Sequence, residues 1–463
     1  MWDKYGNYAE RVKIMKKIAI ITLCILFLFL LPGCIDKKGP SPDTPVTLNM
    51  WHVYGSQTTS PLNDAIDEFN KSVGMENGIV INVVSVTSSS AIDKALESSA
   101  KGEPGANELP DLFTAYPRVA EIVGKDKLLA WDDYFTKNEL AAFNKEFISE
   151  GYFDNRLLML PIAKSTEAFY INKTLFNRFS EKTGTDYSSL SEFDGIFETA
   201  KLYYDTTGSD FMQINDHYHY FLLGMKSYGE ELITDGKLNC ESSAFEELWK
   251  KLAGCAIYGG LCLEDGYAAA RWKTAEVISN IGSTADILYQ PKMVFYPDNT
   301  SEAIESVALP YPSFGTPEKY TVYRGGGLFA LESPDEKKNR AAYIFAEWLT
   351  EKSNNLGFVT KAGYLPVTDA ALEGIFETDY TDASYKNLYE TVNIMTDSHK
   401  FIPIPLFDKA SELQHDFEKN IKFVLKSARN NYAERVAAGE DKDAVMDELI
   451  SSSLSQFKVL CAY

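Results

Sequence analysis

The chain has 463 residues, of which 45% are hydrophobic and 24% are charged, with 29 glycines and 18 prolines. This composition is typical of globular proteins and excludes disordered, collagen-like and coiled-coil chains. The formal net charge of −21 argues against nucleic acid as a partner, because an acidic surface repels phosphate backbones.

The first 34 residues have the pattern of a bacterial export signal. Met15-Lys16-Lys17 precede an apolar run over 18–31, which is shorter than the roughly 20 residues that a membrane-spanning helix needs. The run ends in Leu31-Pro32-Gly33-Cys34, which resembles a lipobox, where the signal is cleaved and the cysteine receives lipid. We therefore expect residues 1–33 to be a signal peptide, with translation starting at Met1 or Met15. We expect Cys34 to anchor the protein to the outer side of the cell membrane.

Residues 34–45 predict a solvated tether, because they combine three prolines, a glycine and several charges. Export also allows disulfides. No CxxC pattern occurs, so a zinc ribbon or a thioredoxin-like site has no support. The sequence leaves open whether the four later cysteines form disulfides or stay as thiols. They are Cys240, Cys255, Cys262 and Cys461.

The first 70 residues after the tether alternate between strand and helix patterns. Residues 46–50 show the period of two that is typical of a strand, and Ser60-Pro61 has the pattern of a helix start. A β-branched run over 79–86 predicts a buried strand, a helix follows from 88–90, and 110–114 predicts another strand. This alternation predicts parallel strands joined by helices.

The rest of the chain is rich in helix patterns. Further strands are expected at 156–163, 168–171, 277–281, 306–309 and 327–331. Helices are expected around 341–349, 410–425 and 441–459. No internal repeat is visible, and the chain is too long for one doubly wound sheet without a second core. We therefore expect an α/β protein with two lobes.

Five motifs occur in an order that resembles a known family. They are Leu48-Asn49-Met50-Trp51-His52; Leu109-Pro110-Asp111-Leu112-Phe113; Leu160-Pro161-Ile162-Ala163 with Phe169-Tyr170-Ile171-Asn172-Lys173; Asn280-Ile281-Gly282-Ser283-Thr284; and Gly363-Tyr364-Leu365-Pro366-Val367. This pattern resembles the family 1 extracellular solute-binding proteins of bacterial ABC importers, the group that contains the maltose-binding protein. The motifs extend over nearly the whole chain after the tether.

The resemblance implies a two-lobed type II periplasmic-binding-protein fold, with several crossings between the lobes and the ligand in the cleft. Lobe one would comprise 46–162 and 327–375, and lobe two 163–326 and 376–463. The lobes would close on a small solute, and the closed protein, expected to be a monomer, would dock on the transmembrane subunits of an ABC permease. No cofactor is expected, because the glycine triplet at 325–327 lacks the pattern of a nucleotide loop.

Candidate ligand contacts follow from the rule that ligands bind beyond the carboxyl ends of strands, and from the resemblance. They lie in loops after strands, in the polar stretch 164–167 that interrupts an apolar segment, and beside the expected crossings. The candidates are Tyr54, Ser56, Gln57, Ser88, Tyr116, Arg118, Lys164, Ser165, Thr166, Glu167, Trp272, Ser283, Thr284 and Arg324. Trp272 is either a stacking platform or a core residue.

Asp216-His217-Tyr218-His219 has two histidines at a metal-like spacing but no third ligand nearby, so we expect a polar loop without metal.

The leading functional hypothesis is a binding protein for a sugar or oligosaccharide, since sugar sites combine aromatic rings with planar polar groups. An anionic solute, such as a glycerol phosphodiester or an acidic sugar, is the alternative if Arg118, Lys164 and Arg324 converge. A surface glycoside hydrolase is a remote alternative that needs two carboxylates, and Glu167 is the single acid that we nominate. We therefore expect no catalysis.

Overall fold

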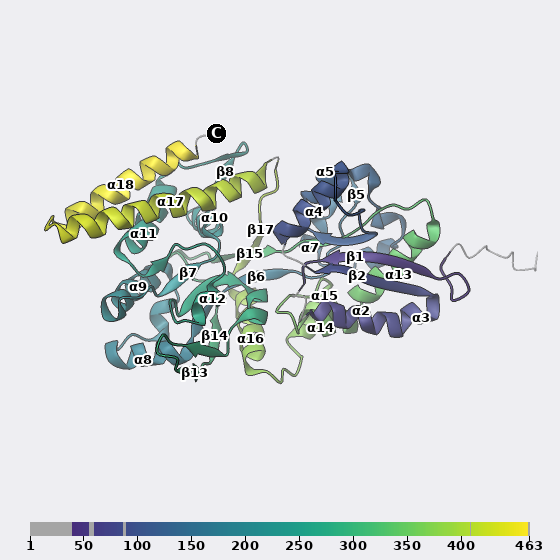
Figure 1. Ribbon diagram of the computed structural model, residues 1–463, viewed down its shortest axis with the longest axis horizontal. Helices are drawn as coiled ribbons and strands as arrows, with labels where there is room; N and C mark the ends of the chain where they lie inside the picture. The colour runs from purple at the N-terminus through teal and green to yellow at the C-terminus, as the bar shows by residue number, and fades with distance from the viewer. Residues whose placement is uncertain (1–38, 55–59, 87–88, 408, 462–463) are drawn as a thin grey trace, which may run out of the picture.

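The computed structural model describes residues 39–54, 60–86, 89–407 and 409–461, and these residues form two lobes side by side (Figure 1). The expected signal peptide, Cys34 and the candidate ligand contacts Ser56, Gln57 and Ser88 lie outside the described residues. Within them, no helix is both long enough and apolar enough to cross a bilayer.

The sheet of lobe one has four strands in the order β16-β3-β1-β2. Its members are β1 (Val46–His52), β2 (Ile79–Val86), β3 (Leu112–Ala115) and β16 (Gly327–Ala330). β1 pairs in parallel with β2 and β3, as the sequence predicts, while β16 joins from the end of a crossing and pairs antiparallel with β3.

The pleat of this sheet divides its apolar side chains between two clusters. Leu112 and Leu328 face α2 and α13, whereas Phe113 and Phe329 stack on the opposite face with ring centroids 5.3 Å apart. Ser60 caps α2 by accepting a hydrogen bond from the backbone N–H of Asn63, as predicted. The helices of lobe one are α2 (Pro61–Lys71), α3 (Val73–Asn77), α4 (Ser89–Lys101), α5 (Val119–Val123), α6 (Lys137–Leu140), α7 (Lys145–Ser149), α13 (Glu336–Thr350), α14 (Lys352–Val359) and α15 (Asp369–Ile375).

Lobe two is built on a mixed sheet in the order β10-β7-β11-β6-β15-β17, with β14 also paired to β6. Its strands are β6 (Ser165–Asn172), β7 (Met212–Ile214), β10 (Leu261–Cys262), β11 (Ser279–Ser283), β14 (Ser306–Leu309), β15 (Tyr320–Arg324) and β17 (Lys400–Pro403). Every residue of β6 is buried. Its side chains pack into apolar clusters on both faces of the sheet, Phe169 and Ile171 in one cluster and Ala168 and Tyr170 in the other.

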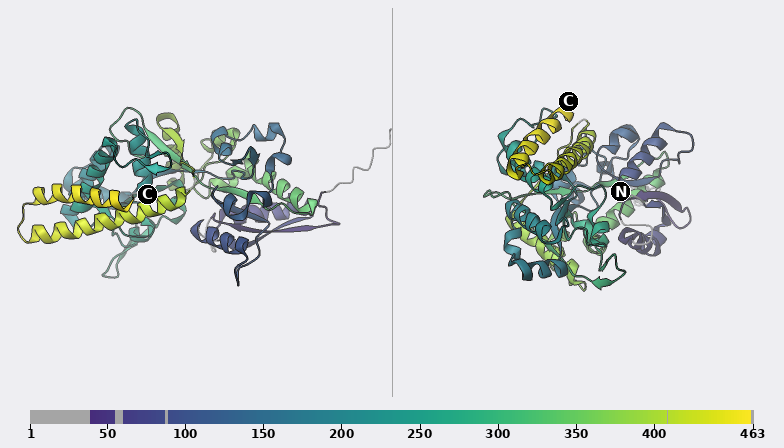
Figure 2. Two further views of the ribbon diagram at one scale, coloured as in Figure 1. Left: turned by 90° about the horizontal axis from the view of Figure 1, so that it is seen from above. Right: turned by 60° about the vertical axis from the view of Figure 1, so that its left-hand side comes forward.

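Helices cover this second sheet. They are α8 (Lys173–Thr183), α9 (Phe193–Thr207), α10 (His217–Ser227), α11 (Ser243–Tyr258), α12 (Ala268–Trp272), α16 (Ala383–Ser398), α17 (Ala410–Ala437) and α18 (Lys442–Leu460). The last two form a long antiparallel pair that packs on α11 and extends along the outside of the lobe (Figure 2). Short hairpins join β4 (Tyr152–Phe153) to β5 (Arg156–Leu157), β8 (Ile233–Thr234) to β9 (Lys237–Leu238), and β12 (Met293–Phe295) to β13 (Ser301–Ala303). The described residues also contain short 3₁₀ helices, namely η1 (Lys125–Lys127), η2 (Trp131–Asp133), η3 (Tyr187–Leu190) and η4 (Thr284–Tyr289).

The chain crosses between the lobes where β6 begins, where β15 leads into β16, and between α15 and α16 (Figure 1). Gly326 lies at the second crossing, and a Cβ atom there would be 2.1 Å from the carbonyl oxygen of Ala115, so a side chain does not fit. The predicted strand over 156–163 is wrong in extent. It ends at β5, and beyond it a single bridge joins Leu160 to Leu328 before Pro161, which has no N–H to donate to a ladder.

The four late cysteines are buried free thiols. Burial raises the pKa of Cys240 and of Cys255 to about 12, so neither is a thiolate at neutral pH.

Candidate functional site

A cleft with a volume of about 650 Å³ lies between the lobes, at the carboxyl ends of β1 and β3. This volume is within the usual range of small-molecule sites. Lobe one, the crossings and lobe two each supply part of its lining. The lining includes Tyr54, Tyr116 and Tyr364 from lobe one; Ser165, Arg324 and Gly325 from the crossings; and Asn215, Tyr267, Lys273, Ser283, Asp286, Tyr289 and Gln290 from lobe two.

The wall from lobe one is uncharged and tightly packed. The ring of Tyr54, only 2% exposed, makes edge contacts with Phe358 and Tyr364 at centroid distances of 5.3 and 5.0 Å. Tyr116 follows β3 and is half-buried. The rings of this wall are therefore held in place before any ligand arrives.

The wall from lobe two has exposed rings and polar side chains. Tyr267 is 73% exposed and Tyr289 is 48% exposed, although both line the cleft. Between them, Asn215 donates a hydrogen bond of 3.0 Å to the carboxylate of Asp286. Burial raises the pKa of Asp286 to about 6 even though Arg324 opposes the change, so this carboxylate is mostly ionised at neutral pH.

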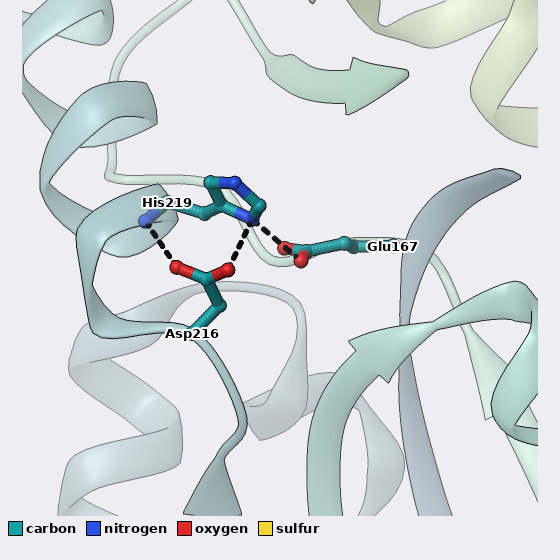
Figure 3. A group of neighbouring side chains, drawn as sticks. All are labelled: Glu167, Asp216 and His219. Atoms are coloured by element: carbon teal, nitrogen blue, oxygen red, sulfur yellow. Dashed lines mark hydrogen bonds and ion pairs between the residues drawn. The ribbon is translucent and has the colours of Figure 1, made fainter. Parts of the chain in front are cut away.

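Four charged groups meet behind the crossing from β15 to β16. Glu167, from the buried strand β6, lies with one oxygen 2.8 Å from Nη1 of Arg324 and 2.8 Å from Nδ1 of His219. Asp216 lies 3.3 Å from the same histidine nitrogen and caps α10 (Figure 3). The network fixes the guanidinium of Arg324, which also lines the cleft.

The pKa of His219 and the pKa of Asp216 shift in opposite directions within the network. Burial lowers the pKa of His219, but the carboxylates of Asp216 and Glu167 outweigh it, and the pKa of His219 is raised overall. Burial raises the pKa of Asp216, but His219 and Arg324 outweigh it and lower that pKa overall. Both shifts favour the charged form of the group concerned.

The same cluster has the outline of a metal site, since ligand atoms of Glu167, Asp216 and His219 lie within 4.8 Å of one another. The guanidinium of Arg324 already supplies a cation, 2.8 Å from Glu167 and 3.9 Å from Asp216, and it would repel a metal ion. We therefore interpret the cluster as an ion-pair network. The expectation of a polar loop at 216–219 is wrong, because Asp216 is the N-cap of α10 and His217 its first residue.

Five of the predicted contact residues line the cleft together. They are Tyr54, Tyr116, Ser165, Ser283 and Arg324. Glu167 lies behind Arg324 and is 1% exposed. Thr166 and Thr284 are fully buried beside each other, with the hydroxyl of Thr284 3.4 Å from the backbone nitrogen of Thr166.

Three other predicted residues lie away from this cleft. Trp272 is fully buried against the apolar residues of lobe two, so the core alternative describes its position. Lys164 is fully buried, with its ammonium 2.5 Å from Glu150 and 2.9 Å from the carbonyl oxygen of Gly325. Arg118 is paired with Asp93 and lines a neighbouring cavity.

Sequence reasoning missed much of the wall from lobe two. Asn215 follows β7 directly, and the rule on strand ends gives a signal for it. Asp286 comes three residues after the expected Ser283, within the turn that Ser283 caps. Tyr267 and Lys273 flank the short helix α12, and nothing in the local pattern points to them.

The comparisons with known proteins agree with this geometry. The family described as bacterial extracellular solute-binding protein matches residues 64–386. No curated protein matches this sequence. The fold is similar to the cyclic α-maltosyl-1,6-maltose binding protein of Arthrobacter globiformis, with 18% identity and a TM-score of 0.61 over 90% of this chain and 100% of that one.

Two further solved structures have the same fold. An ABC substrate-binding protein of Listeria monocytogenes in complex with cycloalternan has 14% identity and a TM-score of 0.65, over 90% of this chain and 100% of that one. UgpB of Mycobacterium tuberculosis in complex with glycerophosphocholine has 16% identity and a TM-score of 0.63, over 90% of this chain and 98% of that one. Because the family match extends over most of the chain, the protein belongs to the bacterial extracellular solute-binding proteins.

Proposed function

We propose that this protein captures a sugar or oligosaccharide in the interlobe cleft and delivers it to the transmembrane subunits of an ABC permease. The observation that carries this proposal is the set of five tyrosines around the cleft, together with amide and carboxylate groups. Sugars have apolar C–H faces that pack on aromatic rings, and hydroxyls that bond to planar polar side chains. Two proteins of similar fold are a binding protein for cyclic α-maltosyl-1,6-maltose and a protein in complex with cycloalternan, and both of these compounds are saccharides.

The ligand contacts that we propose are the predicted residues lining the cleft, together with Asn215, Tyr267, Asp286 and Tyr289. The lobes, 46–162 with 327–375 and 163–326 with 376–463, would close by rotation at the crossings. Lipid on Cys34 would hold the protein near its permease. Catalysis is not part of the proposal, because Glu167 is buried in ion pairs rather than facing the cleft beside a second acid.

An anionic solute is the second candidate, and the glycerophosphocholine complex of UgpB is the observation that favours it. The positive charges that it requires are each paired with a carboxylate. Arg118 pairs with Asp93, Lys164 with Glu150, and Arg324 with Glu167. None of these three cations is left uncompensated. The cleft lining also holds Lys273, but the carboxylate of Asp286 in the same lining balances its charge, so a neutral solute fits the cleft better.

A thermal-shift screen of the purified protein separates the two candidates. The panel contains neutral mono- and oligosaccharides, acidic sugars and glycerol phosphodiesters. A ligand that binds only the folded state at a hundredfold excess over Kd adds about 2.7 kcal/mol to its stability. We expect a shift with a neutral saccharide that is lost in Tyr116→Ala and Ser165→Ala. Phe423→Ala is a matched control, because Phe423 is 63% exposed on α17 and does not line the cleft. A shift with anionic solutes alone, lost in Arg324→Ala, would overturn the proposal in favour of the second candidate.

A further inference from the structure

Two of the buried cysteines lie on segments that pack against each other. Cys240 follows β9 and comes just before Ser242, the N-cap of α11, while Cys461 ends α18. Lys458, one turn before Cys461, has its ammonium 2.9 Å from the carboxylate of Glu241, the residue after Cys240. The C-terminal end of α18 therefore lies beside the start of α11, next to the β8–β9 hairpin (Figure 1).

Apolar packing holds the two cysteines in one region of lobe two. The ring of Phe457, in the last turn of α18, has its centroid 4.8 Å from that of Trp249 on α11. Cys240 and Cys461 belong to the same apolar cluster as these rings and are 8% and 7% exposed. The amide nitrogen of Asn420, from α17, lies 3.5 Å from Sγ of Cys461. Both thiols are therefore buried near the point where α11, α17 and α18 meet.

The ionisation of Cys240 depends on Cys461. Burial is the largest cause that raises the pKa of Cys240, and the thiol of Cys461 raises it further. An electrostatic effect of this kind weakens with distance, so it agrees with two neighbouring sulfurs. For Cys255 and Cys262, burial is again the largest cause, and the smaller ones come from charged and backbone groups rather than from the other thiol.

We infer that Cys240 and Cys461 form a disulfide in the exported protein, which ties the C-terminal end of α18 to the start of α11, and that Cys255 and Cys262 stay as thiols. The structure has all four in the reduced form. The family to which the chain belongs is extracellular, and disulfides form and persist outside the reducing cytoplasm.

The oxidation requires a partner disulfide, such as that of an exported thiol–disulfide oxidoreductase. The two cysteines lose two protons and two electrons as their sulfur–sulfur bond forms. The sulfur–sulfur bond of the partner breaks, and the partner takes up these protons and electrons as a dithiol. Exchange needs a thiolate that the partner can reach, and burial opposes both conditions. The bond therefore forms during folding, before α18 has packed on α11.

The bond would stabilise the C-terminal part of lobe two. It closes a loop that contains α11, α16, α17 and most of lobe two, and a closed loop reduces the conformational entropy of the unfolded chain. For a protein of this size, we expect the melting temperature to rise by about 4 °C.

Peptide mapping of the full-length protein, purified after export by a bacterial host, tests this inference. The protein is unfolded without reductant, its free thiols are alkylated with iodoacetamide, and its peptides are identified by mass spectrometry. We expect a linked pair of peptides that contains Cys240 and Cys461 and disappears after reduction. Cys255 and Cys262 should carry the alkyl group. Alkylation of Cys240 and Cys461 as free thiols, or a bond from either of them to another cysteine, would overturn the inference.

Thermal unfolding with and without dithiothreitol tests what the bond does. Reductant should lower the melting temperature of the wild type by about 4 °C and leave that of Cys461→Ser unchanged. Cys255→Ser is the matched control, because it removes a buried thiol outside the pair and should keep both the linked peptides and the effect of reductant. Each protein is compared with itself, so packing lost through a substitution does not affect the result. A wild type whose melting temperature does not respond to reductant would overturn the stabilising role of the bond.

Discussion

The two walls of the cleft differ in how firmly their tyrosines are held. On lobe one, Tyr54 is 2% exposed and locked between Phe358 and Tyr364. On lobe two, Tyr267 is 73% exposed and Tyr289 is 48% exposed. A ring of the first kind contributes to folding whether or not ligand is present, while a ring of the second kind gains most of its contacts when the cleft closes.

The walls also differ in charge. The lining from lobe one is neutral, whereas Asp286 and Lys273 of lobe two face the cleft and Arg324 stands at the crossing. Lobe one therefore presents packed aromatic rings to the cleft, and lobe two presents charged and polar groups. Substitutions on the two walls should therefore separate stability from affinity.

Tyr54→Ala should produce the largest effect, a loss of about 4 kcal/mol in the free energy of unfolding, because a buried aromatic ring leaves a cavity. Urea unfolding followed by circular dichroism measures this value. Tyr54→Phe keeps the edge contacts with Phe358 and Tyr364, so its loss should stay below about 1 kcal/mol. Equal losses in the two variants would show that the ring is not the stabilising feature of this wall.

Arg324→Met should cost about 3 kcal/mol of stability and also abolish ligand binding, because it leaves Glu167 buried without one of its cations. Arg324→Lys keeps the charge, and it should retain much of the stability while weakening binding. Urea unfolding and titration of the same preparations give both values. If Arg324→Met were as stable as the wild type, the ion pair between Arg324 and Glu167 would not contribute to the stability of the folded protein.

Much of lobe one could be predicted from the sequence. Its strands alternate or run as β-branched stretches, and Ser60-Pro61 marks the start of α2. The path of 158–163 could not, because a fully apolar segment predicts a buried strand as well as any other buried path. The start of α10 was also missed. Asp216 stands before two histidines, and it is recognisable as a helix cap only if the residues after it are known to form a helix.

The residues of the candidate site also fall into two groups, those that the sequence predicts and those that it does not. Tyr54 and Tyr116 follow strands and Ser283 is the last residue of β11, so a rule about strand ends finds them. Tyr267 lies in an irregular segment before α12, and only the folded chain brings it to the cleft. The sequence also could not show which charged residues pair. The partner of Lys164 is 14 residues away along the chain, and the partner of Arg324 is 157 residues away.

The pH dependence of stability provides a finer test of the network. The pKa of His219 is raised in the folded protein, so its stabilising contribution is complete below its ordinary value of 6.5 and is lost as pH rises through the raised value. One proton limits the slope to about 1.4 kcal/mol per pH unit. We expect the stability of the wild type minus that of His219→Gln to fall above pH 6.5. Taking this difference removes groups that titrate alike in both proteins, and a difference that rises over this range would contradict the raised pKa.

Tyr267→Ala should have the smallest effect on the folded protein and the most selective effect on binding. Because the ring is 73% exposed, its removal should change the free energy of unfolding by no more than about 0.5 kcal/mol. Loss of one aromatic contact to the ligand should weaken binding by about 1 kcal/mol, or roughly fivefold in Kd. Titration with the saccharide from the screen and urea unfolding give the two values, and Tyr289→Ala should behave alike. If Tyr267→Ala bound the saccharide normally but lost stability, the exposed ring would stabilise the fold and not the complex. The wall from lobe two would then be as preformed as the wall from lobe one.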